Sequence, residues 1–117
     1  MDREILNKMI SGPEKNHYVG LYSESQKFNT LNQMLLKCGV EHILAICIEE
    51  MSELQKELTK VLRGNPSRLG IMEEMVDVQM SLDYISVIFD TRFDPKISAI
   101  HNIKLDRMKR YLEDQNS

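Results

Sequence analysis

The chain has 117 residues, of which 42% are hydrophobic and 28% are charged, so we expect one globular domain rather than a disordered segment. The net charge of -3 argues against a general nucleic-acid-binding protein, and an aromatic content of 6% without Trp argues against extensive base stacking. We find no apolar run of membrane-span length and no signal-peptide layout in MDREILNKMI, and Cys38 and Cys47 lack CxxC spacing. We therefore expect a cytoplasmic protein that binds neither nucleic acid nor a membrane.

Residues 1–25 are the part of the chain whose structure the sequence specifies least. Ile5, Leu6, Met9 and Ile10 have the spacing of a short helix, which the run from Ser11 to Pro13 would end. We interpret 1–25 as an N-terminal extension that contains at most a short helix, and 26–117 as the main helical domain.

Helical spacing of apolar residues then continues through four segments. Gly39 separates the first two, Gly64-Asn65-Pro66 ends the second, and Asp94-Pro95 has the pattern that starts a helix. No stretch alternates with a period of two residues, so no sheet is expected. The prediction is an all-α, four-helix bundle-like fold that forms oligomers. Its helices are expected at about residues 26–39, 40–63, 69–89 and 94–113.

The second predicted helix carries acids inside an apolar segment, ICIEEMSEL. Helical residues advance about 100° each, which places Glu50 and Glu53 on one face, at the border of an apolar arc. An ordinary solvated acid would lie opposite that arc. The arc comprises Ile43, Cys47, Met51, Leu54, Leu58 and Val61.

The third predicted helix repeats the pattern in IMEEMVDVQM. Glu74 and Asp77 flank its apolar stripe, whereas Glu73 lies further from it, so the preferred frame is Glu74-x-x-Asp77. A second apolar group, which includes Val76 and Met80, lies on the other side of the helix. A helix with two apolar faces is central to its fold or meets another subunit.

Ion pairs on the helix surface are the ordinary explanation for such acids. Glu53 with Lys56 and Glu57 with Lys60 have the i,i+3 spacing of such pairs, which are common and weak. For Glu57 we prefer this interpretation and expect a solvated surface residue.

A divalent cation is the preferred explanation for the acids at the core border. Burying unpaired carboxylates is costly, and no arginine lies within either acidic segment. Oxygen ligands favour Mg²⁺, with Mn²⁺ as a possible substitute, and the absence of His from both segments disfavours di-iron and zinc sites. The predicted metal ligands are Glu50, Glu53, Glu74 and Asp77.

The fourth predicted helix is basic between residues 96 and 110, where Asp106 is the only acid. Lys104 falls within its apolar face and Arg107 lies at the edge of that face. Lys104 either extends its ammonium group to solvent or is directed at substrate phosphates, and the sequence leaves both open.

The acidic pattern resembles a known family. Glu49-Glu50-x-x-Glu53 followed by Glu74-x-x-Asp77 is similar to the EExxE…ExxD signature of MazG-like, all-alpha nucleoside triphosphate pyrophosphohydrolases. The RGNP turn at 63–66 and the KLDRMKR run at 104–110 add to the resemblance, which covers about residues 27–112.

The resemblance implies a Mg²⁺-dependent hydrolase that converts a nucleoside triphosphate to the monophosphate and pyrophosphate, in nucleotide-pool control or house-cleaning. It implies a homodimer or homotetramer. It also implies that the four predicted ligands hold Mg²⁺, that Glu49 orients the attacking water or helps bind a further Mg²⁺, and that Lys104 and Arg107 contact the phosphates. The preferred base stays open: Asn29, Asn32 and Gln33 could read a base edge or simply face solvent.

The alternative function is a non-enzymatic helical oligomerisation or interaction module. Eight Met residues and a helix with two apolar faces suit such a module. It leaves unexplained why acids border the core on two consecutive helices.

Overall fold

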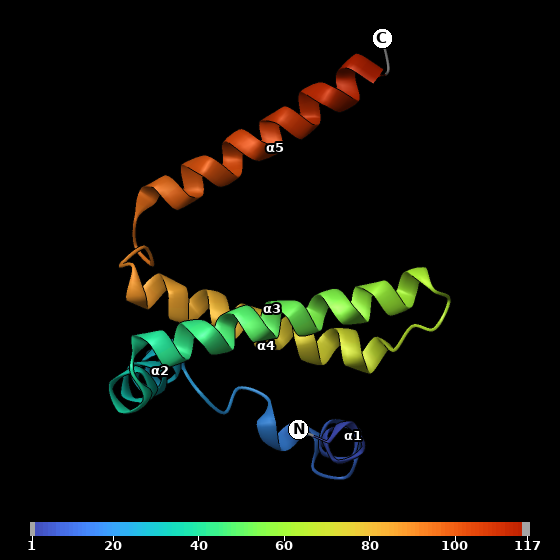
Figure 1. The fold of residues 1–117 in the computed structure, drawn as a ribbon, viewed down its shortest axis with the longest axis vertical. Helices are drawn as coiled ribbons and strands as arrows, with labels where there is room; N and C mark the ends of the chain where they lie inside the picture. Colours follow the sequence, from blue (N-terminus) through green and yellow to red (C-terminus); the bar gives the residue numbers. More distant parts are fainter. Residues whose placement is uncertain (1, 116–117) are drawn as a thin grey trace. The chain divides into compact units, whose positions relative to one another are not determined.

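In a computed structural model, which describes residues 2–115, the chain is entirely helical, and the described residues form no strand (Figure 1). The all-α prediction is confirmed, and the short N-terminal helix is present. Each of the four later helices begins and ends within two residues of its predicted bounds. The elements are α1 (Arg3–Ser11), the 3₁₀ helix η1 (Lys15–Tyr18), α2 (Glu24–Cys38), α3 (Val40–Leu62), α4 (Arg68–Ile88) and α5 (Pro95–Gln115).

Local chemistry explains the helix ends. Asp2 caps α1 by accepting hydrogen bonds from the backbone N–H groups of Glu4 and Ile5, and Ser23 forms a reciprocal capping box with Gln26 at the start of α2. Gly39, with φ of 87°, joins α2 to α3 in a conformation that side-chain-bearing residues rarely adopt. These caps define where helices start and stop, independently of tertiary contacts.

The chain divides into two compact units, Met1–Ile85 and Ser86–Ser117. The first unit contains α1, η1, α2, α3 and most of α4, and the second contains α5. In the second unit, the Asp94 side chain accepts a hydrogen bond from the backbone N–H of Lys96 at 3.0 Å, as expected for a residue that starts a helix.

Helices α3 and α4 lie side by side and run antiparallel (Figure 1). The Cys47 thiol on α3 donates to the backbone carbonyl of Ser81 on α4 at 3.7 Å. Further along α3, Glu57 lies against Gly70 of α4. Because residue numbers rise along α3 as they fall along α4, the acidic segments of the two helices face each other across one seam.

The hydrophobic core of the described residues is small. The buried apolar residues are Phe28 and Leu31 of α2 and Ile43 and Cys47 of α3. Other apolar side chains of the first unit are strongly exposed, with Leu36 at 88%, Ile48 at 70% and Leu62 at 89%. Surfaces of this kind, when contiguous, mark contacts with other molecules.

The predicted apolar arc of α3 is correct at its N-terminal end and wrong at its C-terminal end. Ile43 and Cys47 are buried, but Leu58 and Val61 are 48% and 42% exposed. Glu57 is buried there instead, at 3% exposure. The sequence periodicity cannot show which part of the chain packs against a helix. Here the charged side chain of Arg3 contacts this end of α3.

Within residues 2–115, no individual helix combines the length and apolar character of a membrane span. Taken together, α2 and α3 meet that criterion by length and composition, with a bend of 115° between them.

Leu31→Ala is expected to lower the free energy of unfolding by about 2–5 kcal/mol, because the 3%-exposed side chain leaves a cavity. Leu36→Ala, on the same helix at 88% exposure, is the matched control and should change it by less than about 0.5 kcal/mol. Urea unfolding followed by circular dichroism measures both. Equal effects would contradict the placement of the core on this face of α2.

Candidate metal centre

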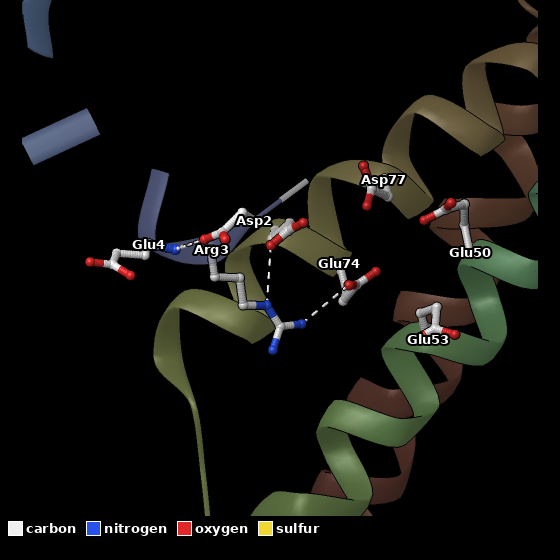
Figure 2. A pocket seen from close by; sticks show the side chains of 8 residues that line it. Asp2, Arg3, Glu4, Glu50, Glu53, Glu74 and Asp77 are labelled. Carbon is white, nitrogen blue, oxygen red and sulfur yellow. Dashed lines mark hydrogen bonds and ion pairs between the residues drawn. The ribbon is translucent and has the colours of Figure 1, made fainter. Parts of the chain in front are cut away.

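Three of the predicted ligands meet across the seam between α3 and α4. Glu50 of α3 and Glu74 and Asp77 of α4 each offer one carboxylate oxygen, and these oxygens lie within 4.8 Å of one another (Figure 2). Glu74 and Asp77 share a face of α4 because they are spaced i,i+3. Glu74 is buried, and the other two are half-buried. We call these three residues the acidic triad.

The acidic triad perturbs its own protonation. Burial, a hydrogen bond with Asp77 and the negative charges of Asp77, Glu74 and Glu49 together raise the pKa of Glu50 from 4.5 to about 7. Burial also raises the pKa of Glu74, helped by the charges of Asp77 and Glu73, although Arg3 opposes the shift. With no cation bound, the site therefore retains a proton near neutral pH.

Two buried oxygens of the described residues lack a hydrogen-bond partner, Oε2 of Glu74 and Oε2 of Glu57. Buried polar atoms are almost always paired, so each requires a physical explanation. Glu74 is only 7% exposed and belongs to the acidic triad. An oxygen-only site with an unsatisfied buried carboxylate fits a hard divalent cation such as Mg²⁺ or Mn²⁺.

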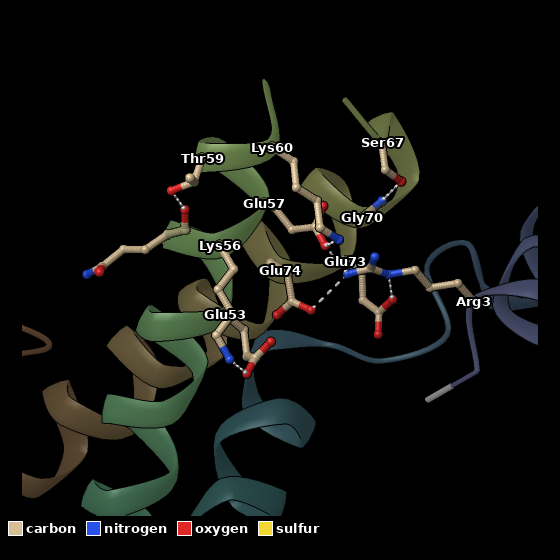
Figure 3. Close-up of polar contacts among 11 residues, drawn as sticks. Arg3, Glu53, Lys56, Glu57, Thr59, Lys60, Ser67, Gly70, Glu73 and Glu74 are labelled. Carbon is tan, nitrogen blue, oxygen red and sulfur yellow. Dashed lines mark hydrogen bonds and ion pairs between the residues drawn. The ribbon is translucent and has the colours of Figure 1, made fainter. Parts of the chain in front are cut away.

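An arginine from outside both acidic segments contributes to the acidic cluster. Arg3 of α1 reaches across from the N-terminal segment, and its Nη2 lies 2.7 Å from Glu57 Oε1 and 3.3 Å from Glu74 Oε1 (Figure 3). Its Nε donates to Glu73 Oε2 at 3.1 Å. Positive charge is thus supplied partly by the protein itself, from a residue about 70 positions away.

The predicted ion pair of Glu57 with Lys60 is present, but the expectation that Glu57 is a solvated surface residue is wrong. It is 3% exposed and binds both Arg3 and Lys60, the latter at 3.1 Å. The hydrogen bond from Arg3 is the main cause of its lowered pKa. A signal was available in the sequence, because Glu57 follows Glu50 by two helical turns and so shares its face.

Glu53 lies beside the acidic triad without joining it. It is half-buried, and its Oε1 accepts a hydrogen bond from Lys56 at 3.0 Å, the surface pairing that its spacing allowed (Figure 3). It does line the same pocket of about 600 Å³. The pocket is lined by Asp2, Arg3, Glu4, Glu50, Glu53, Glu73, Glu74 and Asp77 (Figure 2).

The remaining predicted site residues are exposed. Glu49 is exposed, and it acts on Glu50 through its charge. Lys104 and Arg107 are exposed residues of α5, in the second unit. Their contact with phosphates stays a prediction.

Comparison of the chain with protein-family models gives no match, and comparisons with curated proteins and with solved structures give none either.

The metal-free protein is expected to lose stability between about pH 5 and about pH 8. A carboxyl whose pKa is higher in the folded state, here about 7 for Glu50, binds its proton more tightly when folded. Its contribution is complete below the ordinary pKa of 4.5 and is lost as the pH rises through about 7.

Glu50→Gln should flatten this pH dependence, because glutamine does not titrate. Glu41→Gln, which removes an exposed acid of the same helix, should keep the wild-type slope. Unfolding free energies measured in chelator across the pH range decide the question. If Glu50→Gln keeps the wild-type dependence of unfolding free energy on pH, the raised pKa of Glu50 is not its cause.

Proposed function

We propose that this protein is a Mg²⁺-dependent nucleoside triphosphate pyrophosphohydrolase, which cleaves between the α- and β-phosphates to give a nucleoside monophosphate and pyrophosphate. The observation that carries the proposal is the acidic triad, where Glu50, Glu74 and Asp77 converge and a buried oxygen of Glu74 has no partner. The order of the acidic motifs resembles that of the MazG-like family, and this resemblance supplies the reaction.

The charge of the pocket supports a metal-bound substrate. Acids dominate its lining, and Arg3 is its only basic residue. A nucleoside triphosphate carries about four negative charges near neutral pH, so the pocket repels it unless cations accompany it. When bound, Mg²⁺ neutralises phosphate charge and makes a coordinated water more acidic.

We assign the metal-holding role to Glu50, Glu74 and Asp77, with Glu53 as a fourth proposed ligand because it lines the same pocket. Glu49, next to Glu50 in sequence and exposed, is proposed to orient the attacking water or accept its proton. Lys104 and Arg107 of α5 are proposed to contact the phosphates. In the reaction, the water oxygen bonds to the α-phosphorus as the bond from that phosphorus to the bridging oxygen breaks. Pyrophosphate leaves with the bridging oxygen, and the proton of the water passes to Glu49 or to solvent.

Assembly into a homodimer or homotetramer, with MazG-type helical bundles, is part of the proposal. The small core and the strongly exposed Leu36, Ile48 and Leu62 support it, because a second copy of the chain would cover such side chains. A cytoplasmic role in nucleotide-pool control or house-cleaning fits this activity.

A non-enzymatic oligomerisation module is the second candidate. The exposed apolar side chains favour it as much as they favour an oligomeric enzyme. The two candidates differ at the acidic triad, which a module does not require.

A panel of nucleoside triphosphates with Mg²⁺ should yield pyrophosphate from at least one substrate. Glu50→Gln and Asp77→Asn should each abolish this release while circular dichroism shows an unchanged helical content. Glu41→Gln, at an exposed position of α3, is the control and should retain the activity. Release of orthophosphate would indicate a different cleavage position, and wild-type turnover in Asp77→Asn would reject the site.

Mg²⁺ is expected to raise the melting temperature of the wild-type protein. At ten times Kd, a ligand that binds only the folded state adds about 1.4 kcal/mol, or about 5 °C for a chain of this size. Asp77→Asn should lose most of the rise, and Glu53→Gln should lose less, because Glu53 lies outside the acidic triad. A wild-type midpoint that does not respond to Mg²⁺ would favour the oligomerisation module.

A further inference from the structure

The guanidinium of Arg3 is held by two carboxylates that do not belong to the acidic triad. Its shortest contact, 2.7 Å, is to Glu57, which is 3% exposed, and a second contact of 3.1 Å is to Glu73. A buried carboxylate needs a close positive partner, so Glu57 holds Arg3 firmly in place. The start of α1 is defined by Asp2, which accepts from the backbone N–H of Glu4 at 2.8 Å.

From this anchored position, Arg3 engages one oxygen of Glu74. Nη2 donates to Glu74 Oε1 at 3.3 Å. The other oxygen, Oε2, is buried and has no hydrogen-bond partner. Figure 2 shows Arg3 on one side of Glu74, with Glu50 and Asp77 on the other. The contact therefore leaves the free oxygen available to the acidic triad.

We infer that Arg3 is a positioning residue of the metal centre, which orients the Glu74 carboxylate so that its second oxygen can bind the cation. Carboxylate ligands of metal ions are commonly held in place by such outer hydrogen bonds, and loss of the partner weakens metal binding. The inference rests on the proposed metal centre, but it does not depend on the proposed hydrolysis. It makes the N-terminal segment part of the site.

Gly70 of α4 permits this arrangement. A Cβ at this position would lie 2.7 Å from Glu57 Oε2 and 2.8 Å from Arg3 Nη1, which is too close for either atom to stay in place. The missing side chain is what lets the Arg3–Glu57 pair lie directly against the backbone of α4.

Arg3 could instead compete with the metal, and that role predicts the opposite change in metal affinity when Arg3 is removed. If the guanidinium occupied the cation's own position, it would compete with the metal for Glu74, and removing it would tighten metal binding. If Arg3 orients Glu74, removing it weakens metal binding. The sign of the change separates the two roles.

The test is a titration of the full chain with Mn²⁺ alone, followed by electron paramagnetic resonance, which counts free Mn²⁺. Arg3→Ala should raise Kd about 10–100-fold, and Arg3→Lys should restore part of the affinity. Lys8→Ala, which removes an exposed charge from the same helix, should leave Kd unchanged. Circular dichroism without metal checks that each variant is folded, so that a general loss of structure is distinguished from a loss of affinity.

Gly70→Ala provides a second route, because it keeps Arg3 while displacing its guanidinium, and it should also raise Kd. Unchanged or tighter Mn²⁺ binding in folded Arg3→Ala or Gly70→Ala would overturn the positioning role. Failure of the wild-type protein to bind Mn²⁺ would overturn the metal centre together with this inference. Binding without any pyrophosphate release would leave the positioning role standing and reject only the proposed hydrolysis.

Discussion

Carboxylates removed from water between α3 and α4 must be balanced by positive charge or by protons. The antiparallel seam places Glu50 of α3 near Glu74 of α4, and Glu57 of α3 against Gly70 of α4, and this constraint organises the first unit. At one end of the seam the balance comes from Arg3 and Lys60. The contact of α1 with the seam therefore has an electrostatic basis.

The negative charge of the carboxylates is not compensated evenly along the seam between α3 and α4. Arg3 lowers the pKa of Glu57, whereas burial and neighbouring negative charge raise the pKa of Glu50 to about 7. Glu74 is subject to both effects: its pKa is raised by burial and neighbouring negative charge, and Arg3 opposes this rise without cancelling it. The acidic triad lies at the end of the seam where Arg3 reaches Glu74 alone. Metal binding there would replace protons, which couples affinity to pH.

Apolar exposure is the second constraint on the first unit. Four of its described apolar residues are buried, which is few for a chain of this length, and several Leu and Ile side chains face outward. A protein of this kind gains stability when another surface covers those side chains. The proposed oligomer would serve that purpose, and it would bring more than one acidic seam into a single assembly.

The sequence by itself determined the helices and part of the site. Apolar periodicity and the signals at Gly39 and Asp94 located the helix ends, because caps and glycine conformations are local properties. The i,i+3 spacing of Glu74 and Asp77 placed both on one face, since that relation follows from helix geometry alone.

Only the tertiary structure decided which charges the acids meet. The pairing of Arg3 with Glu73 joins residues 70 positions apart, and no helical periodicity relates them. The local pattern correctly indicated the ion pair of Glu57 with Lys60, but it could not indicate the burial of Glu57, because Arg3 comes from a distant part of the chain. Helix geometry is set by neighbours along the chain, whereas burial and charge balance are set by neighbours in space.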